Sequence, residues 1–268
     1  MPLENRRLED GRLDEKIAIV TGAGRGIGYA YAERFLREGA SVMIAEIDAE
    51  TGKQAAASLS ESGPVDFVHT DVTSPDSVEA CVQATVDRFG GLHILLNNAA
   101  LYGDWDMGDQ SFDYLKKVVD VNQHSVWLMS HAAAPRMVEG GGGRIINQAS
   151  GAAYNYVSPF RPETFNGMGT FNYQIAKYGV VGLTKYMAGA LGSWNITVNC
   201  IAPGVIDTEA TRKTVPVAII ERLAQQQAVP GVLNAEDLTG AAVYFASDES
   251  RFVTGQVLVI DGGKHMPA

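Results

Sequence analysis

Short apolar runs alternate with amphipathic helical patterns along almost the whole chain. Continuous apolar runs, such as those at residues 17–20, 42–45 and 257–260, are typical of strands covered on both faces, as in a parallel sheet. Regular alternation of strands and helices implies right-handed crossovers and a doubly wound sheet. We therefore predict an α/β fold of the Rossmann type, with about seven parallel strands and with helices on both faces of the sheet.

The spacing of the apolar positions places the individual elements. The predicted strands are Ile17–Val20, Val42–Ala45, Val65–His69, His93–Leu96, Arg144–Gln148, Thr197–Ile201 and Val257–Ile260. The predicted helices are Gly26–Arg37, Ala49–Ser60, Ser77–Phe89, Phe112–Met137, Asn172–Leu191 and Ala235–Ala246, with Asp76 and Ser111 as N-caps and Gly39 and Gly90 as helix ends. No polar linker interrupts the alternation. We therefore predict one dinucleotide-binding domain over residues 1–268, which includes a polar N-terminal extension at residues 1–12.

Two long connections, residues 151–172 and 203–230, break this rhythm. Each follows a predicted strand, and the ligand of a doubly wound sheet binds at the carboxyl ends of the strands. Long irregular loops in a compact domain are usually functional, so we expect both to line a substrate site. The aromatic residues between 154 and 172 further predict a wall or lid over that site, with a subunit contact or a packed surface loop as the alternative.

Charge and hydropathy exclude several classes of partner. With 31 acidic and 21 basic residues the formal net charge is −10, whereas nucleic-acid binding needs a basic surface. An anionic membrane surface is disfavoured for the same reason. The apolar runs are too short to cross a bilayer, and the first sixteen residues contain no apolar stretch typical of a secretory signal. We expect a cytoplasmic protein.

Cysteine and histidine usage argues against a metal site. Cys81 falls in a helical pattern and Cys200 in a strand pattern, which predicts two buried free thiols. The five histidines show neither an H-x-x-x-H pair nor a C-x-x-C partner, so we expect no metal.

A glycine-rich segment, Thr21–Gly28, directly follows the first predicted strand and has the pattern T-G-x-x-x-G-x-G. Its glycines, Gly22, Gly26 and Gly28, allow a tight turn and let backbone N–H groups approach a pyrophosphate at a helix N-terminus. A glycine-rich turn without a ligand is the alternative, but the position after the first strand favours dinucleotide binding.

The acid after the second strand bears on the choice of cofactor. Glu46 stands where a carboxylate hydrogen-bonds the adenosine ribose hydroxyls and repels a 2′-phosphate, which favours NAD over NADP. Asp48 is interpreted as a helix cap. Arg25, inside the glycine loop, points the other way because a guanidinium there can reach a 2′-phosphate.

Tyr173 and Lys177 are four residues apart in a helical pattern, which puts both side chains on one face. An ammonium close to a phenol stabilises phenolate, so that the tyrosine can act as a general base near neutral pH. Taken alone, this spacing also occurs in surface helix pairs.

These motifs occur in one order with several others: Asp71-Val72, Asn97-Asn98-Ala99, Asn122, Ser150, Pro203-Gly204 with Thr208, and Asp261-Gly-Gly263. The set resembles that of the short-chain dehydrogenases/reductases, and the resemblance runs from about Leu13 to Gly263. It implies that Tyr173 is the catalytic base and acid, and that Lys177 binds the nicotinamide ribose and lowers the pKa of the tyrosine. It also implies that Ser150 binds the substrate oxygen and that Asn122 holds a water in a proton relay.

The resemblance further implies a set of cofactor contacts. Asp71 and Val72 are expected to flank the adenine, Asn98 and Ala99 to lie along the cofactor, and Ile206 and Thr208 to hold the carboxamide. With the residues discussed above, the expected cofactor contacts are Gly22, Arg25, Gly26, Ile27, Gly28, Glu46, Asp71, Val72, Asn98, Ala99, Tyr173, Lys177, Pro203, Gly204, Ile206 and Thr208.

Two departures from the family pattern concern the substrate side. Ala100 stands where the family usually has glycine, and Ser150 and Tyr173 are 23 positions apart, a longer separation than is usual. The expected substrate contacts are Tyr102, Trp105, Tyr154, Tyr156 and Phe160. These aromatic residues suggest an apolar, cyclic or aromatic alcohol, although packing within the loops is an alternative role for them.

The sequence therefore predicts an NAD-dependent oxidoreductase that interconverts a secondary alcohol and a ketone. The alternatives are an NADPH-dependent carbonyl or 3-oxoacyl reductase, which shares every catalytic residue, and a non-catalytic dinucleotide-binding sensor on the same fold. By resemblance, the helices that begin at Phe112 and at Asn172 form subunit contacts. We accordingly expect a homotetramer, or failing that a dimer.

Overall fold

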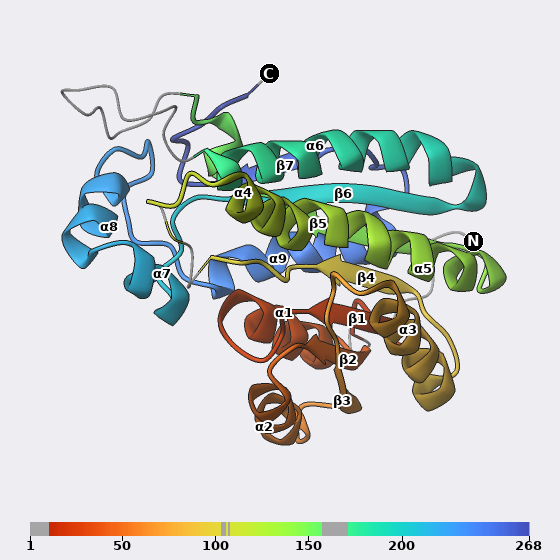
Figure 1. Ribbon diagram of the computed structural model, residues 1–268. Coiled ribbons are helices and arrows are strands. Elements are labelled where there is room, and N and C mark those ends of the chain that lie inside the picture. The colour runs from red at the N-terminus through yellow and green to blue at the C-terminus, as the bar shows by residue number, and fades with distance from the viewer. Residues whose placement is uncertain (1–10, 103–105, 107, 157–170, 268) are drawn as a thin grey trace.

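The computed structural model describes residues 11–102, 106, 108–156 and 171–267 (Figure 1). In this part of the chain, parallel strands form a seven-stranded sheet with the order β3-β2-β1-β4-β5-β6-β7. The strands are β1 (Ile17–Thr21), β2 (Ser41–Glu46), β3 (Val65–His69), β4 (Ile94–Asn97), β5 (Gly143–Gln148), β6 (Ile196–Pro203) and β7 (Val257–Ile260). The predicted doubly wound α/β sheet is confirmed.

Helices cover both faces of the sheet. One face carries α1 (Gly26–Arg37), α2 (Ala49–Leu59) and α9 (Glu236–Ala246), and the other carries α3 (Pro75–Phe89), α5 (Ser125–Glu139) and α6 (Asn172–Leu191). At the carboxyl ends of the strands, on the left of Figure 1, lie α7 (Glu209–Thr214) and α8 (Val217–Ala224). The ligand edge predicted for such a sheet is therefore the edge that these short helices border.

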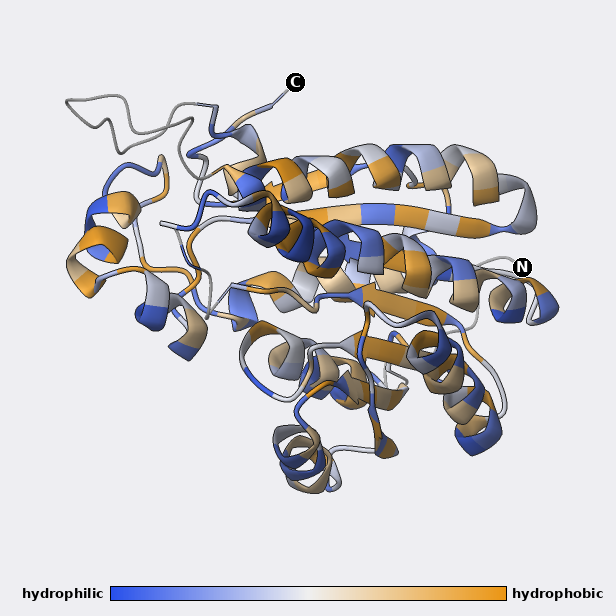
Figure 2. Ribbon diagram, in the orientation of Figure 1, coloured by the Kyte–Doolittle hydropathy of each residue, from blue (hydrophilic) through white to orange (hydrophobic). Residues whose placement is uncertain are grey.

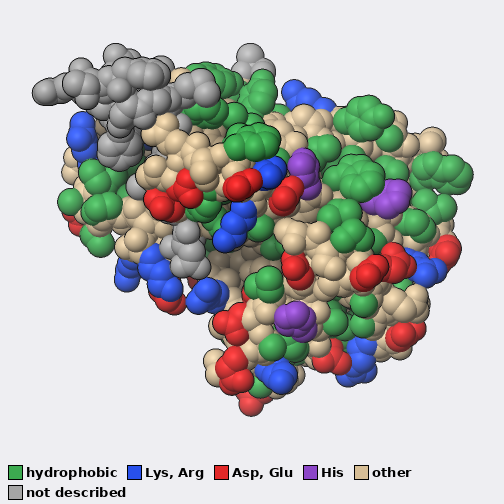
Figure 3. All heavy atoms as spheres, viewed as in Figure 1, with side chains coloured by type: hydrophobic (Ala, Val, Ile, Leu, Met, Phe, Trp, Pro, Cys, Tyr) green, Lys and Arg blue, Asp and Glu red, His purple; other side chains and the backbone are tan. Residues whose placement is uncertain are grey.

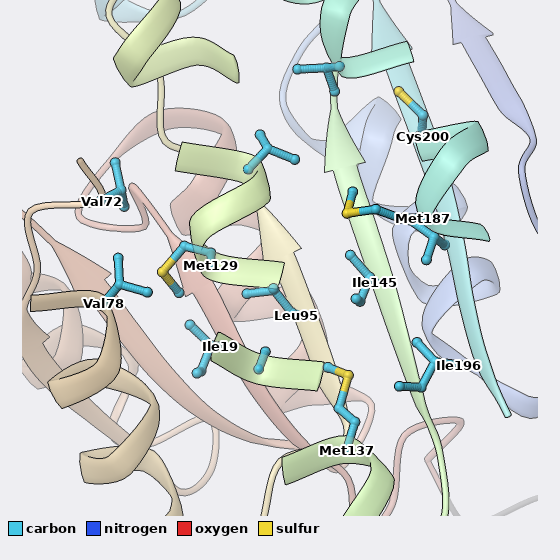
Figure 4. Packing of buried hydrophobic residues seen from close by; sticks show 14 of the residues in the cluster. Ile19, Val72, Val78, Leu95, Met129, Met137, Ile145, Met187, Ile196 and Cys200 are labelled. Carbon is cyan, nitrogen blue, oxygen red and sulfur yellow. The ribbon is translucent and has the colours of Figure 1, made fainter. Parts of the chain in front are cut away.

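The strands are apolar throughout because each one supplies two hydrophobic cores. Along β1, Ile19 belongs to the core under α3, α5 and α6, whereas Ala18 and Val20 belong to the core under α1, α2 and α9. Figure 4 shows Ile19 packed with Leu95 and Met129 in the first of these cores. In Figure 2 the central strands are largely hydrophobic, while the helices carry both polar and apolar residues.

The helix signals of the sequence were correct at three of four positions. Ser111 accepts a hydrogen bond from the Tyr114 N–H at the start of α4 (Phe112–Val119), Gly90 ends α3 with φ 92°, and Gly39 follows α1 with φ 92°. The prediction of Asp76 as an N-cap is wrong. The cap of α3 is Ser74, and Pro75 takes the first helical position, which leaves Asp76 inside the first turn.

Two predicted segments have a different local structure. The single helix expected over Phe112–Met137 is interrupted by a π-helical turn, η1 (Asp120–His124), that separates α4 from α5. A π-helical turn inserts an extra residue, so it shifts the faces of the two helices relative to one another. The connection 203–230, expected to be irregular, contains α7 and α8.

No helix in the described residues is both long and apolar enough to cross a membrane. The same part of the chain holds no group of three His, Cys, Asp or Glu side chains arranged to bind a metal ion. Cys81 and Cys200 are both buried and free. On the face seen in Figure 3, acidic and basic side chains are interspersed.

Candidate active site

The glycine loop after β1 has the conformation that its glycines allow. Gly22 and Gly26 have φ of 63° and 59°, the left-handed region that favours glycine. A Cβ on Gly28 would lie 2.1 Å from the Gly22 carbonyl oxygen, and a Cβ on Gly22 would lie 2.8 Å from Ala99 Cα. No side chain caps the N-terminus of α1, so its first N–H groups face the loop region. This loop fits a pyrophosphate.

Asn98 braces this loop. Its side-chain amide donates to the carbonyl oxygens of Thr21 and Gly22, both at 3.0 Å, and its amide oxygen accepts from Gln148 at 3.2 Å. The Thr21 hydroxyl in turn accepts from the backbone N–H groups of Asn98 and Ala99 at 2.9 and 3.0 Å. The structure thus places the Asn98 side chain under the glycine loop as a support for its backbone.

Glu46, at the end of β2, is held against the same loop. One carboxylate oxygen accepts from the Gly24 N–H at 3.1 Å and the other from the Ile47 N–H at 2.9 Å. Asp48 caps α2 by accepting from the N–H groups of Glu50 and Thr51, as predicted. A carboxylate fixed by two backbone donors has a defined position beside the glycine loop.

Arg25 lies within electrostatic reach of two other carboxylates. The pKa of Asp48 is lowered mainly by its hydrogen bonds with Thr51 and that of Glu209 mainly by Lys213, and Arg25 contributes to both shifts. The guanidinium thus has acidic neighbours on both sides of the crevice, at the start of α2 and at the start of α7.

The remaining adenine-side residues follow β3. The Asp71 carboxylate accepts from the backbone N–H and the hydroxyl of Thr73 at 2.9 and 2.7 Å. Val72 is buried in the hydrophobic core with Val78, as Figure 4 shows. Two of the predicted adenine contacts are therefore tied into the turn that leads to α3.

The loop after β6 faces the glycine loop. Thr208 caps α7 by accepting from the Thr211 N–H, and the nearest atom to a Cβ built on Gly26 is its methyl carbon, at 4.0 Å. Ile206 is buried and pairs with Leu233. A Cβ on Gly204 would lie 2.8 Å from Asp261 Cβ. The glycine loop and the start of α7, from the two halves of the sheet, therefore face one another.

Tyr173 and Lys177 lie on the buried face of α6. Tyr173 is 8% exposed and Lys177 2%. The lysine Nζ donates to the Gln148 carbonyl oxygen at 2.9 Å and lies 5.7 Å from the centroid of the Tyr173 ring. A buried ammonium tied to the end of β5 is unlike a surface helix pair, because burying a charge is costly without a specific partner.

Burial sets the charge states of this pair. The pKa of Tyr173 is raised, first by desolvation and then by the nearby Tyr102, while a hydrogen bond with the Ser150 side chain opposes the rise. Desolvation also lowers the pKa of Lys177 to about 8. Burial therefore dominates the pKa of Tyr173, and the lowering of that pKa by Lys177 stays a prediction.

Asn122 and Ser150 complete the predicted catalytic set. Asn122 lies in η1 and is fully buried; its amide nitrogen donates to the Val118 carbonyl oxygen at 3.0 Å. Its amide oxygen has no hydrogen-bond partner among the described residues, as expected of an acceptor for a buried water. Ser150 follows β5 and caps a 3-10 turn, η2 (Gly151–Tyr154), by accepting from the Ala152 N–H at 3.1 Å.

The predicted substrate contacts have different environments. Tyr102 lies against the base, with ring centroids of Tyr102 and Tyr173 5.2 Å apart. Tyr154 is half-buried in η2, and Tyr156 is 77% exposed and packs edge-on against Tyr178. Trp105 and Phe160 lie outside the described residues, as does most of the segment expected to form a lid.

Several polar residues that organise the site lie outside the motifs found in the sequence. Gln148 accepts from the Tyr31 hydroxyl at 2.7 Å, besides its contacts to Asn98 and Lys177. Beside it, Asn147 accepts from Asn97 at 2.9 Å. The sequence does contain one signal for them, the adjacent amides Asn147 and Gln148 at the end of an apolar strand. Buried amides need hydrogen-bond partners, so such a pair indicates a polar network.

Comparison with known proteins identifies the family. A family model described as enoyl-(acyl carrier protein) reductase matches residues 22–265. An uncharacterized oxidoreductase of Mycobacterium tuberculosis is 40% identical over 94% of this chain and 98% of its own length. The chain belongs to the short-chain dehydrogenases/reductases, and it is an oxidoreductase of that family.

Named relatives differ in their substrates. Borneol dehydrogenase of Lavandula x intermedia is 38% identical over 94% of this chain and 91% of its own length. The 3-oxoacyl-[acyl-carrier-protein] reductase of Chlamydia muridarum is 35% identical, over 94% and 98% of the two chains.

Solved structures show the same fold with bound cofactors. A 7α-hydroxysteroid dehydrogenase in complex with NADH and 7-oxoglycochenodeoxycholic acid has a TM-score of 0.85 and 31% identity, covering 94% of this chain and 95% of the other. Carveol dehydrogenase from Mycobacterium avium in complex with NAD has a TM-score of 0.85 and 26% identity, covering 95% and 99%. These neighbours support a nicotinamide dinucleotide as the cofactor of this chain.

Proposed function

We propose that this protein is an NAD-dependent dehydrogenase that interconverts an apolar, cyclic secondary alcohol and its ketone. The observation that carries the proposal is the arrangement around Tyr173. The phenol is buried and hydrogen-bonded with Ser150, it is flanked by Tyr102, and it shares a helix face with the buried Lys177. A dinucleotide-binding sensor without catalytic function needs none of these groups.

The chain's own residues account for the proton. Ser150 and Tyr173 hold the alcohol oxygen, and Tyr173 takes the hydroxyl proton as the C–H bond of the carbinol breaks and the carbonyl forms. NAD, when bound, supplies the hydride acceptor and a positive charge near the phenol. That charge and Lys177 favour the phenolate, against the burial that raises the tyrosine pKa. Asn122 holds a water that carries the proton toward solvent.

The position of Glu46 supports NAD over NADP. Its carboxylate is fixed by backbone donors beside the glycine loop, so a 2′-phosphate placed there meets a negative charge that has little freedom to move away. Arg25 favours the alternative, an NADPH-dependent carbonyl or 3-oxoacyl reductase. However, the acidic neighbours of Arg25 reduce the positive potential it offers a phosphate.

Relatives and lining residues support the substrate class. Borneol and carveol, named in two of the similar proteins, are secondary alcohols on carbon rings, and a third acts on a hydroxysteroid. In this chain, Tyr102 and Tyr154 place aromatic surface next to the base and to the serine turn. Aromatic walls favour an apolar ring over a charged carrier-bound chain.

The test is a substrate panel followed by one substitution. Borneol, carveol, cyclohexanol and 2-butanol are assayed with NAD and with NADP by absorbance of the reduced cofactor. We expect turnover of a cyclic alcohol with NAD, and we expect Tyr173→Phe to lower it by about 100- to 10,000-fold with NAD binding retained. Unchanged turnover in the variant would show that Tyr173 is not the base. Turnover with NADP alone would favour the alternative, an NADPH-dependent carbonyl or 3-oxoacyl reductase.

Assembly and location remain part of the proposal. Large apolar side chains are exposed on α4, α5 and α6, namely Phe112, Trp127, Ile175, Tyr178 and Tyr186. Figure 3 shows hydrophobic side chains gathered over α5 and α6. Exposed patches of this kind mark protein contacts, so we propose a homotetramer, which light scattering after size-exclusion chromatography tests. We also propose that the protein is cytoplasmic, which fractionation of the cells that make it tests.

A further inference from the structure

A buried carboxylate lies at the end of β7, outside the residues predicted for catalysis or cofactor binding. Asp261 is 2% exposed. Its two oxygens accept from the backbone N–H groups of Gly263, Lys264 and His265 at 3.0, 2.9 and 2.9 Å. Its fourth partner is the His265 imidazole, with Nδ1 2.6 Å from the carboxylate oxygen. This carboxylate therefore closes the turn after β7 around itself.

The turn after β7 is in contact with the second substrate-site loop. The Val229 N–H donates to the Gly262 carbonyl oxygen at 2.8 Å, and a Cβ on Gly262 would lie 2.6 Å from the Val229 carbonyl oxygen. Gly262 has φ 65°, so the turn and the loop meet where only glycine fits without strain. Asp261 also packs against Gly204, the start of the same loop.

The imidazole reaches the first substrate-site loop. A Cβ on Gly151 would lie 3.2 Å from His265 Nδ1, so the ring occupies space that a side chain at 151 would take. Its other nitrogen, Nε2, lies 3.3 Å from the Asn155 side-chain oxygen. In Figure 1 the C-terminal end of the chain passes beside the turn that follows β5. His265 therefore contacts both ends of the turn that Ser150 caps.

The Ser150 turn is one short hydrogen-bonded unit. The Ser150 hydroxyl accepts from the Ala152 N–H, the Ala153 N–H donates to the Ser150 carbonyl, and the Asn155 N–H donates to the Ala152 carbonyl. One end of the unit is fixed by β5. The other end, at Asn155, is fixed in the described structure by His265.

We propose that Asp261 and His265 form a positioning pair that holds the Ser150 turn against the loop after β6, and so sets the distance between Ser150 and Tyr173. This rests on the proposed function, in which Ser150 binds the substrate oxygen. Neither residue touches the reacting atoms in this role. Loss of the pair should leave the conformation of the glycine loop, residues 22–28, unchanged.

The chain contains a matched control for this pair. Asp120 and His124 have the same four-residue spacing and a 2.8 Å contact, but both side chains are more than half exposed. In the Asp261–His265 pair the corresponding side chains are only 2% and 16% exposed. An exposed pair contributes little to rigidity, whereas a buried one fixes what it contacts.

Steady-state kinetics on the full-length protein, with the best panel alcohol and NAD, tests the pair. We expect His265→Ala to lower kcat/KM by roughly ten- to a hundredfold, with a raised KM for the alcohol and an NAD dissociation constant within about twofold of the parent. His265→Gln reaches Asn155 and should recover part of the loss. His265→Asn, which reaches only Asp261, should not recover any of the loss. Asn155→Ala should lower kcat/KM as much as His265→Ala does, and the double variant should lower it no further. His124→Ala should behave as the parent.

Hydrogen exchange separates this proposal from the proposed function. Faster exchange at residues 151–155 in His265→Ala, with unchanged exchange at residues 22–28, supports the pair even if no panel alcohol is turned over. Parent-like exchange at 151–155 overturns it. So does full activity in His265→Ala or His265→Asn, or an equal loss of NAD binding and thermal stability in all three His265 variants.

Discussion

The two sides of the crevice are built by different means. On the cofactor side, the glycine loop is shaped by backbone contacts at van der Waals distance and braced by Asn98 and Thr21. On the substrate side, the Ser150 turn and the loop after β6 are held by side chains from distant parts of the chain, Asp261 and His265 among them. The first side tolerates few residue types at Gly22 and Gly28, while the second combines tight contacts at Gly204 and Gly262 with side-chain contacts that leave room for variation. This division suits a family whose named members differ in their substrates.

Among the variants that compare the two sides, the largest expected effect is on the cofactor side. In Gly28→Ala the new methyl group meets the Gly22 carbonyl oxygen, a backbone atom that cannot move without distorting the loop. Overpacking of this kind costs about 1–3 kcal/mol, so we expect the affinity for NAD to fall by up to roughly 100-fold. Titration by fluorescence measures the affinity. Gly240→Ala on α9, where an added Cβ also meets nothing within 4 Å, is the control.

If Gly28→Ala binds NAD as the parent does, the conclusion that tight backbone contacts fix the cofactor side is wrong. If it is lost while the fold is kept, as circular dichroism can show, the loop acts through its backbone.

The same contrast explains what was predictable. The alternating elements and the Gly22, Gly26 and Gly28 positions follow from local rules, because each needs only its own neighbours in sequence to be identified. The role of Gln148 depends on residues far along the chain, since Gln148 joins Tyr31, Asn98 and Lys177.

The His265–Asn155 contact shows the limit more sharply. These residues are 110 positions apart, and neither belongs to a local sequence motif that predicts the contact. Local patterns predict that residues 151–172 and 203–230 line a substrate site, which stays a prediction. They did not indicate that the turn after β7 would join them.

The next prediction concerns pH and the substrate side. Burial raises the pKa of Tyr173, so the phenol is protonated at neutral pH and the base form is scarce. Alcohol oxidation needs the phenolate, and kcat/KM for it should therefore rise with pH, by up to about tenfold per unit below the governing pKa. Ketone reduction needs the phenol as an acid, so it should be flat at low pH and fall at high pH.

The pH profiles are measured for alcohol oxidation and for ketone reduction. In contrast, we expect NAD binding to vary little between pH 6 and about 7, because this range lies below the lowered pKa of Lys177, about 8. Oxidation that falls with rising pH over this range would contradict Tyr173 as the base.

A smaller effect is expected when Glu46 is replaced. Glu46→Ser removes the carboxylate that a 2′-phosphate would meet, and it frees the N–H of Gly24. We expect the preference for NAD over NADP, measured as the ratio of kcat/KM values, to shrink by about tenfold. Glu50→Ser, an exposed carboxylate in the first turn of α2, is the control. An unchanged ratio would mean that another residue selects the cofactor.

The smallest expected effect sharpens the substrate side. Tyr102 is the neighbour that adds to the raised pKa of Tyr173, and its ring lies 5.2 Å away, centroid to centroid. Tyr102→Phe keeps the ring and removes the hydroxyl, so the pH dependence of alcohol oxidation should shift toward lower pH while KM for a cyclic alcohol changes by only about two- to threefold. Tyr244→Phe, on α9 across the sheet, should leave both unchanged. A Tyr102→Phe variant with the parent's pH profile would show that Tyr102 acts only as aromatic wall. A large loss of kcat with the parent's KM would instead place its hydroxyl in the chemistry, and the substrate side would then have fixed positions of its own.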